Sequence, residues 1–229
     1  MTSTSSRWPC YPHEALAVVL SVRDGRLSVL LWQRAREPFQ GCWALPGGAL
    51  GTDERLGTSL ARQLADKVDV REITHLEQLE TRSDPRRDPR ERRLATAYLG
   101  LVPSDSDPAV PPDTAWHPYQ GLPATAFDHG SLVDSGVARL RAKLSYTNLG
   151  FALAPRTFTI SELREIYTAA LGYDVSATNL QRVLLRRGAL RATGQVAAPG
   201  RSGGRPAARY EFTSRTLQVT DPFAALRPR

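Results

Sequence analysis

The chain has 229 residues, with 30 basic and 23 acidic side chains, and its net charge is +7. This length allows one large domain or two small ones, and 41% hydrophobic residues are enough for an ordinary core. No apolar run approaches the roughly 18 residues of a membrane-spanning helix, and the N-terminus lacks a signal-peptide core. Two cysteines without a disulfide framework suit a reducing compartment. We therefore expect a cytoplasmic globular protein with no membrane partner.

The charge is unevenly distributed along the chain. Residues 1–140 carry 16 basic and 18 acidic side chains, whereas residues 141–229 carry 14 and 5. We interpret these two parts as separate domains, and the asymmetry predicts a polyanionic partner for the basic one. The alternative is a charged surface that only keeps the protein soluble.

The N-terminal part predicts a mixed α+β domain. Asp24 and Gly25 form a typical hairpin turn between the first two strands. A helix is expected over 53–67, because leucines recur there at every fourth position. Strands are predicted by apolar or alternating runs over 14–22, 27–33, 43–45, 73–81 and 93–102, and near residue 116.

The C-terminal part predicts a winged helix-turn-helix. A helix over 132–148 is followed by a second helix, which Thr159 and Glu162 begin as a capping box and Gly172 ends. A short turn leads to a third helix over 177–187, and two strand-like segments then flank a basic, glycine-rich loop. Helix, helix, turn, helix and hairpin, in this order, are typical of that DNA-binding module.

The third helix of this module has the two faces that a recognition helix requires. Leu180 and Leu184 share an apolar face, while the polar face carries Asn and Arg, which read base edges and bind phosphates. Arginines among glycines at the wing tip suit a close approach to the DNA backbone. The residues predicted to contact DNA are Thr159, Ser176, Thr178, Asn179, Arg182, Arg186, Arg201 and Arg205. The alternatives are an exposed basic helix with a disordered loop, an RNA-binding module, or a phosphate cradle at the wing.

A stretch of the N-terminal part, GALGTDERLGTSLARQLADKVDV over 48–70, resembles the Nudix box. WALPGG precedes it, and the motif positions are matched by Gly48, Glu54, Arg62, Leu64 and Val70. The resemblance implies a Nudix fold, with a mixed sheet between helices. Nudix hydrolases hold Mg²⁺ with clustered glutamates, but the corresponding residues here are Gln63, Asp66 and Lys67. Since one neutral and one basic group replace carboxylates, and the four histidines have no metal-ligand spacing, we predict no metal site and little hydrolysis.

Over residues 13–213 the chain is similar to the Nudix-related transcriptional regulators of NAD metabolism, the NrtR family. The most specific segments are Arg87-Asp88-Pro89-Arg90, Phe158-Thr159 and Gly204-Arg205-Pro206 with Tyr210. The resemblance implies an effector domain at 1–140, which binds ADP-ribose or a related NAD-derived nucleotide, and a DNA-binding domain at 141–229. It further implies a homodimer, expected to be a repressor, that leaves a palindromic operator of NAD genes when the effector binds. No cofactor would be required.

The same resemblance suggests how the effector would be held. Arginines would neutralise the pyrophosphate, aromatic rings would offer faces to the adenine, and glycines would let the backbone approach. The residues predicted for this site are Arg34, Phe39, Trp43, Gly47, Gly48, Arg87 and Arg90. The alternatives are a core position for Trp43 and an ion-paired or solvated charge for Arg87. The competing functions are an active Nudix pyrophosphohydrolase with an accessory basic domain, and a regulator that senses another ligand, such as a sugar phosphate.

Overall fold

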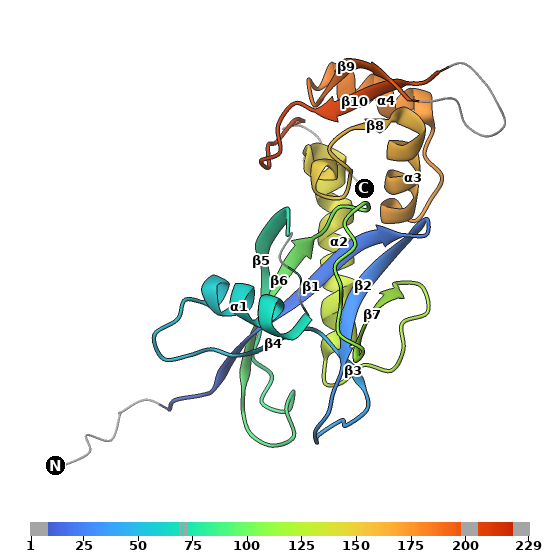
Figure 1. Ribbon diagram of the computed structural model, residues 1–229. Coiled ribbons are helices and arrows are strands. Elements are labelled where there is room, and N and C mark those ends of the chain that lie inside the picture. The colour runs from blue at the N-terminus through green and yellow to red at the C-terminus, as the bar shows by residue number, and fades with distance from the viewer. Residues whose placement is uncertain (1–8, 69, 71–72, 198–205, 222–229) are drawn as a thin grey trace.

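The computed structural model describes residues 9–68, 70, 73–197 and 206–221. An N-terminal module is built on a seven-stranded sheet, and a C-terminal module on helices and a three-stranded sheet (Figure 1). This arrangement confirms the α+β class and the Nudix-like and winged-helix modules. Among the described residues, none of the helices combines the length and apolar character that a membrane span needs.

The large sheet has β1 at its centre. Its strands follow the order β3-β2-β1-β6-β5, with β4 paired to β1 and β7 paired to β2. β1 and β6 are parallel and the other pairs are antiparallel, so the sheet is mixed as expected. The strands are β1 (His13–Arg23), β2 (Arg26–Gln33), β3 (Trp43–Ala44), β4 (Gly47–Ala49), β5 (His75–Arg82), β6 (Leu94–Leu101) and β7 (Thr114–Pro118).

One helix covers each face of this sheet. Alternate residues of β1 from Ala15 to Val19 pack with Leu60 and Leu64 of α1 (Leu56–Val68). The intervening residues face α2 (His129–Tyr146), which crosses the opposite face (Figure 1). Burial on both faces explains why β1 is apolar without alternation.

The C-terminal module has the predicted winged-helix order. Thr159 and Glu162 form the reciprocal capping box, Gly172 ends the second helix with a φ of 81°, and Ser176 caps the third. The three-stranded sheet has the order β8-β10-β9. The elements are η1 (Leu149–Ala152), β8 (Phe158–Thr159), α3 (Ile160–Leu171), α4 (Ala177–Arg186), β9 (Leu190–Val196) and β10 (Ala208–Phe212).

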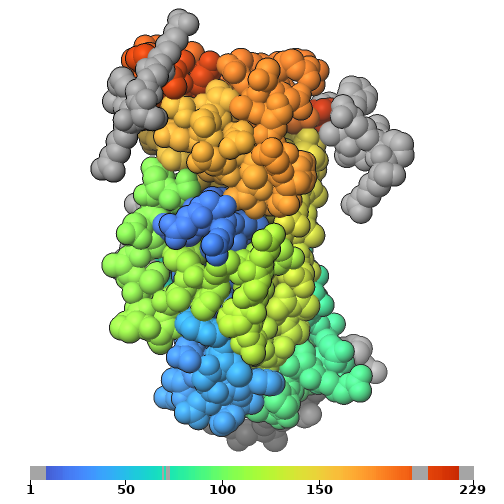
Figure 2. All heavy atoms as spheres, turned by 90° about the vertical axis from the view of Figure 1, so that its right-hand side faces the viewer, coloured from blue at the N-terminus to red at the C-terminus, as the bar shows by residue number. Residues whose placement is uncertain are grey.

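The helix α2 belongs to both modules. A single hydrophobic cluster extends from the sheet through Leu132, Leu140 and Leu144 of α2 to Leu163 of α3 and Leu184 of α4. Figure 2 shows the dark blue β1–β2 turn lying directly beneath the orange helices of the C-terminal module, and α3 contacts both strands of that hairpin. α2 continues without a break across residue 140, and the hydrophobic core includes residues on both sides of it. The domain boundary at residue 140 therefore stays a prediction.

Candidate functional site

Three loops meet at the end of the sheet that lies farthest from the winged helix (Figure 1). They are the segment 34–42 after β2, the segment 83–93 before β6, and the segment 123–128 before α2. The predicted ligand residues are concentrated in the first two. The third loop, which no sequence pattern indicated, contributes an aromatic ring that contacts residues of the other two.

Phe127 is the centre of an aromatic and arginine cluster. Its ring contacts the edge of the Phe39 ring, with centroids 4.9 Å apart. The guanidinium of Arg34 lies 4.7 Å from its centroid and that of Arg90 lies 5.9 Å away. Phe39 and Phe127 both have a positive φ, 65° and 53°, which is rare for bulky residues and is typical of functional sites. Arg34, Phe39 and Arg90 are thus brought together, with Phe127 as the residue that the sequence did not indicate.

Trp43 lies outside this cluster. It packs against the hydrophobic core, and its ring pairs with that of His117 at 4.2 Å. This position matches the core alternative that the sequence left open for Trp43. A role in stacking on adenine stays a prediction, and Phe39 is the more exposed of the two rings, at 39%.

Gly47 and Gly48 lie on β4, between β1 and α1. Gly47 has a φ of 150°, and a Cβ there would lie 2.1 Å from the carbonyl oxygen of Ala15, so only glycine fits. A Cβ on Gly48 would lie 2.8 Å from the side chain of Gln63. Both glycines therefore serve the packing of β4, and their predicted approach to a ligand is untested.

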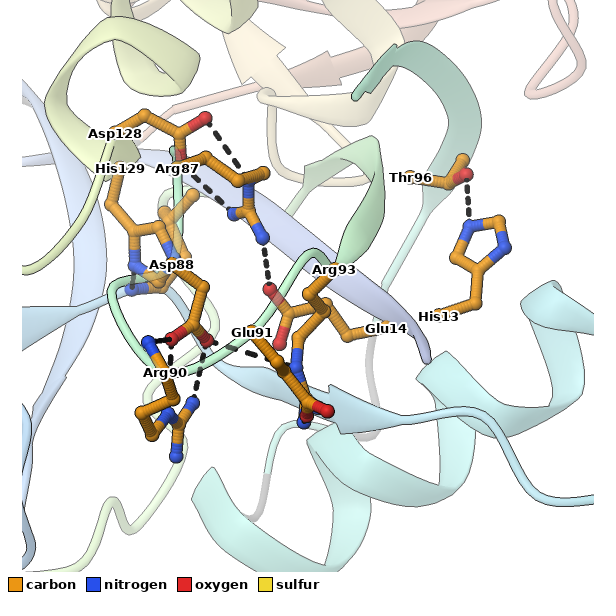
Figure 3. A network of polar contacts seen from close by, with 11 residues as sticks. His13, Glu14, Arg87, Asp88, Arg90, Glu91, Arg93, Thr96, Asp128 and His129 are labelled. Carbon is orange, nitrogen blue, oxygen red and sulfur yellow. Dashed lines mark hydrogen bonds and ion pairs between the residues drawn. The ribbon is translucent and has the colours of Figure 1, made fainter. Parts of the chain in front are cut away.

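Arg87 is held inside an ion-pair network (Figure 3). Its side chain is 1% exposed, and it donates to Glu14 Oε1 at 2.7 Å and to both carboxylate oxygens of Asp128 at 2.9 and 3.3 Å. Burial disfavours the charge, but these two carboxylates outweigh it and raise the pKa of Arg87. The structure therefore gives Arg87 the ion-pair role that the sequence allowed as an alternative, and it argues against a direct contact with pyrophosphate.

Asp88 orients the neighbouring arginines. Its carboxylate is 1% exposed and accepts hydrogen bonds from Arg90 Nη2 at 2.7 Å and from Arg90 Nε at 3.0 Å, while Arg93 Nε lies 3.7 Å away (Figure 3). The hydrogen bonds from Arg90 lower the pKa of Asp88. Arg90 itself stays exposed, so Asp88 fixes a guanidinium that a ligand can still reach.

His129 lies next to this network at the first turn of α2. The backbone N–H of Leu45 donates to its Nδ1 at 3.0 Å, so the neutral ring carries its proton on Nε2, which has no hydrogen-bond partner among the described residues. Burial, together with repulsion from Arg87 and Arg34, lowers the pKa of His129 to about 3. His129 is therefore an uncharged ring that joins the segment directly after β3 to α2.

The Nudix-like helix α1 retains one ion pair of the motif. Arg62 donates to both oxygens of Glu54, at 2.7 and 2.8 Å, and the N–H of Gly51 also donates to Glu54. The hydrogen bonds from Arg62 lower the pKa of Glu54 to about 2. The carboxylate of Glu54 is therefore ionised but already committed to Arg62.

The remaining motif positions do not fit a divalent metal ion. Gln63 is buried against Gly48, Asp66 points from an exposed position, and the ammonium of Lys67 donates to the carbonyl oxygen of Gly47 at 2.7 Å. Among the described residues, no group of three His, Cys, Asp or Glu side chains is arranged to hold a metal. Since Mg²⁺ requires several oxygen ligands, and carboxylates above all, the residues of α1 do not suit it.

The polar face of α4 is open to solvent. Leu180 and Leu184 are buried, whereas the predicted contact residues on this helix are exposed: Thr178, Asn179, Arg182 and Arg186. Arg182 donates to Asn179 Oδ1 at 2.7 Å, so these two side chains are held together. The face therefore has the shape and chemistry of a recognition helix.

The other residues predicted to contact DNA differ in their structural roles. The hydroxyls of Thr159 and Ser176 serve as helix caps, and Thr159 is 8% exposed, so its first role is structural. Arg201 and Arg205 lie outside the described residues. The structure also shows a contact that was not predicted. Gln181 Nε2 donates to Tyr210 Oη at 2.9 Å, and this hydrogen bond joins α4 to the wing strand β10.

Comparison with known proteins matches both modules. Residues 12–134 match the NUDIX domain, and residues 150–212 match the NrtR DNA-binding winged helix domain. The chain is 30% identical to an ADPR responsive transcriptional repressor, NtrR, of Acinetobacter baylyi, over 96% of this chain and 90% of that protein.

Two solved structures are similar as well. Shewanella oneidensis NrtR complexed with a 27mer DNA has a TM-score of 0.74 and 32% identity, covering 87% of this chain and 93% of that one. The NUDIX domain of the same protein complexed with ADP ribose has a TM-score of 0.52 and 32% identity, covering 58% and 90%.

Proposed function

Because the chain belongs to the NrtR family of Nudix-related transcriptional regulators, we propose that it is an ADP-ribose-responsive repressor. ADP-ribose, or a related NAD-derived nucleotide, occupies the Nudix-like module and releases the winged helix from an operator of NAD biosynthesis genes. The observation that carries this proposal is that two metal-ligand positions of α1 hold Gln63 and Lys67, while arginines and aromatic rings gather at the nearby loops. A site whose motif positions do not suit a metal ion, and which presents arginines and an exposed aromatic ring, suits sensing better than hydrolysis.

The effector site uses the cluster around Phe127. Arg34 and Arg90 face the pyrophosphate, because guanidinium groups match phosphate oxygens in two parallel hydrogen bonds. The exposed ring of Phe39 offers a stacking face for the adenine. Asp88 orients Arg90, and Arg87 pairs with Asp128, the residue that follows Phe127. No cofactor is needed for this binding.

The DNA site uses α4 in the major groove. Asn179 and Arg182 read base edges, while Arg186 and the arginines of the wing contact the phosphate backbone. A homodimer places two copies of α4 on a palindrome, since the symmetry of the protein is then matched by that of the operator. A regulator of this kind acts in the cytoplasm, where its operator lies.

The two sites are coupled through α2. Its first turn, with Asp128 and His129, adjoins the effector site, and its last turns belong to the core of the winged helix. Eighteen residues span about 27 Å, at about 1.5 Å per residue. The effector favours one arrangement of the winged-helix modules over the other by its differential affinity for the two.

A gel shift with the protein's own upstream DNA or an NAD-gene promoter tests this function. We expect the wild type to form a specific complex with the DNA, and ADP-ribose to dissociate that complex. The variant Arg182→Ala should bind the DNA poorly but should bind ADP-ribose as well as the wild type does. A complex that is indifferent to ADP-ribose but released by sugar phosphates would assign a different effector. A complex that loses no affinity in Arg182→Ala would contradict the role of α4.

A hydrolysis assay separates this function from an active Nudix pyrophosphohydrolase. ADP-ribose is incubated with the protein in Mg²⁺ or Mn²⁺, and release of AMP is measured. We expect turnover far below that of ordinary enzymes, which is about 1 s⁻¹ or more. Turnover in the ordinary range would show that Glu54 and Asp66 suffice for catalysis, and it would overturn the sensor assignment.

A further inference from the structure

The cations around the Nudix-like site differ in whether a carboxylate neutralises them. Arg62 pairs with Glu54, Arg90 with Asp88, and Arg87 with two carboxylates. Each of these pairs places opposite charges within 3 Å, which reduces the net charge that each arginine presents to an incoming anion, although the exposed Arg90 can still donate hydrogen bonds to it.

Arg34 and Lys67 have carbonyl partners instead. Arg34 Nε donates to the carbonyl oxygen of Pro38 at 2.9 Å, and Lys67 Nζ donates to that of Gly47 at 2.7 Å. Neither forms an ion pair with a carboxylate within the part of the chain that the structure describes. A carbonyl oxygen positions a cation without supplying an opposite charge, so neither cation is neutralised by its partner.

Lys67 and Arg34 lie close enough for their charges to affect each other. Packing of neighbouring atoms, followed by repulsion from Arg62 and Arg34, lowers the pKa of Lys67, although the residue remains exposed to solvent. Glu14 acts on Lys67 and on Arg34 alike. The backbone agrees with this closeness. The ammonium of Lys67 approaches the ring of Trp32, which stands two residues before Arg34, and Gly47 pairs with Leu16, two residues after Glu14.

The ammonium of Lys67 also lies near an aromatic ring. Its ammonium lies 5.5 Å from the centroid of the Trp32 ring, and the indole of Trp32 donates to the carbonyl oxygen of Leu45 at 3.1 Å. Lys67 is therefore a positioned charge on α1, held between a ring of β2 and a carbonyl of β4. It lies on the helix where the Nudix motif would present a carboxylate toward a metal ion.

We propose that Lys67 takes the place of the divalent metal, and that Lys67 and Arg34 together bind the pyrophosphate of the effector without any metal ion. This inference rests on the proposed function and adds to it the chemistry of recognition. The ligand class is nucleoside diphosphate diesters, in which each phosphate carries one negative charge, so two unneutralised cations match it. The repressor would then respond to ADP-ribose at any Mg²⁺ concentration.

Isothermal titration calorimetry of the full-length protein with ADP-ribose tests the proposal, in EDTA and in millimolar Mg²⁺. We expect the wild type to bind equally well in both. Lys67→Met keeps the apolar stem and removes the charge, and it should bind about tenfold to a hundredfold more weakly in both buffers. Lys67→Arg should retain most of the affinity. Arg55→Met is the matched control, because it removes an exposed charge one residue before the same helix and should leave the affinity unchanged.

The outcomes separate this inference from the proposed function. Binding by the wild type only in Mg²⁺, or equal affinity of Lys67→Met and the wild type, would overturn the role of Lys67 and leave ADP-ribose as the effector. Absence of wild-type binding in both buffers would overturn the proposed function itself. Circular dichroism melts of each variant verify that the fold is kept.

Discussion

His129 makes the stability of the protein depend on pH in a defined window. The ring is buried, and its Nδ1 accepts a hydrogen bond from Leu45 N–H, so a proton on Nδ1 would set two donors against each other. The folded-state pKa is lowered to about 3, whereas an unfolded histidine titrates near 6.5. Between these values the unfolded chain binds the proton and the folded chain does not.

The sign and size of the effect follow from this difference. The contribution of His129 to stability is fully present above the unfolded pKa and is lost as the pH falls below it. One pKa unit corresponds to about 1.4 kcal/mol, so the step from about pH 7 to about pH 5 should lower the free energy of unfolding by about 2 kcal/mol through this residue alone. Because the ring is almost fully buried, solvent screening does not reduce the figure.

Equilibrium urea unfolding, followed by tryptophan fluorescence at both pH values, measures this loss. The variant His129→Asn keeps an acceptor for Leu45 N–H but does not titrate, so the other histidines and the carboxylates contribute equally to both proteins. We expect the wild type to lose about 2 kcal/mol more than the variant over this step. An equal pH dependence of the two proteins would refute the reasoning.

Gly136→Ala should lower the free energy of unfolding by about 1–3 kcal/mol in the same urea assay, since the new Cβ would lie 2.7 Å from Val18 Cγ1. An unchanged urea midpoint would mean that α2 can move off the sheet at no cost. Arg87→Met should lose about 3 kcal/mol, because Asp128 and Glu14 are left without their cation; a loss under about 0.5 kcal/mol would contradict a buried ion pair. Arg186→Gln should reduce the slope of log operator affinity against log salt by about 1 in fluorescence anisotropy, with ADP-ribose affinity unchanged, whereas a wild-type slope would exclude a phosphate contact.

The elements that could be predicted are those whose surroundings are reflected in a local sequence pattern. The leucines of α1, the capping box of α3 and the exposed polar face of α4 were readable because helix period and capping chemistry are local. The winged-helix order then followed from the sequence of elements. The helix α2 was expected from residue 132, but it begins at His129, since the first turn is buried by tertiary contacts and carries no apolar period.

The proposed effector site was only partly predictable, because its contacts join distant segments. The sequence selected Arg34, Phe39 and Arg90 by residue type, and the structure places all three at one ring. That ring, Phe127, stands in a loop without any motif, so nothing local indicated it. Arg87 shows a second limit, because an arginine that binds phosphate and a buried arginine that pairs with two carboxylates look alike in sequence.

The shared helix α2 also bears on how such a protein can be recombined with others. One core runs along the helix, from the sheet to the winged helix, and includes Leu140 and Leu144. A graft of another DNA-binding module must therefore either bring a matching face for these leucines or keep α2 whole and exchange only the residues after Thr147. The exchanged part then contains all of residues 150–212, and its boundary lies directly at the end of a helix that is packed against both modules.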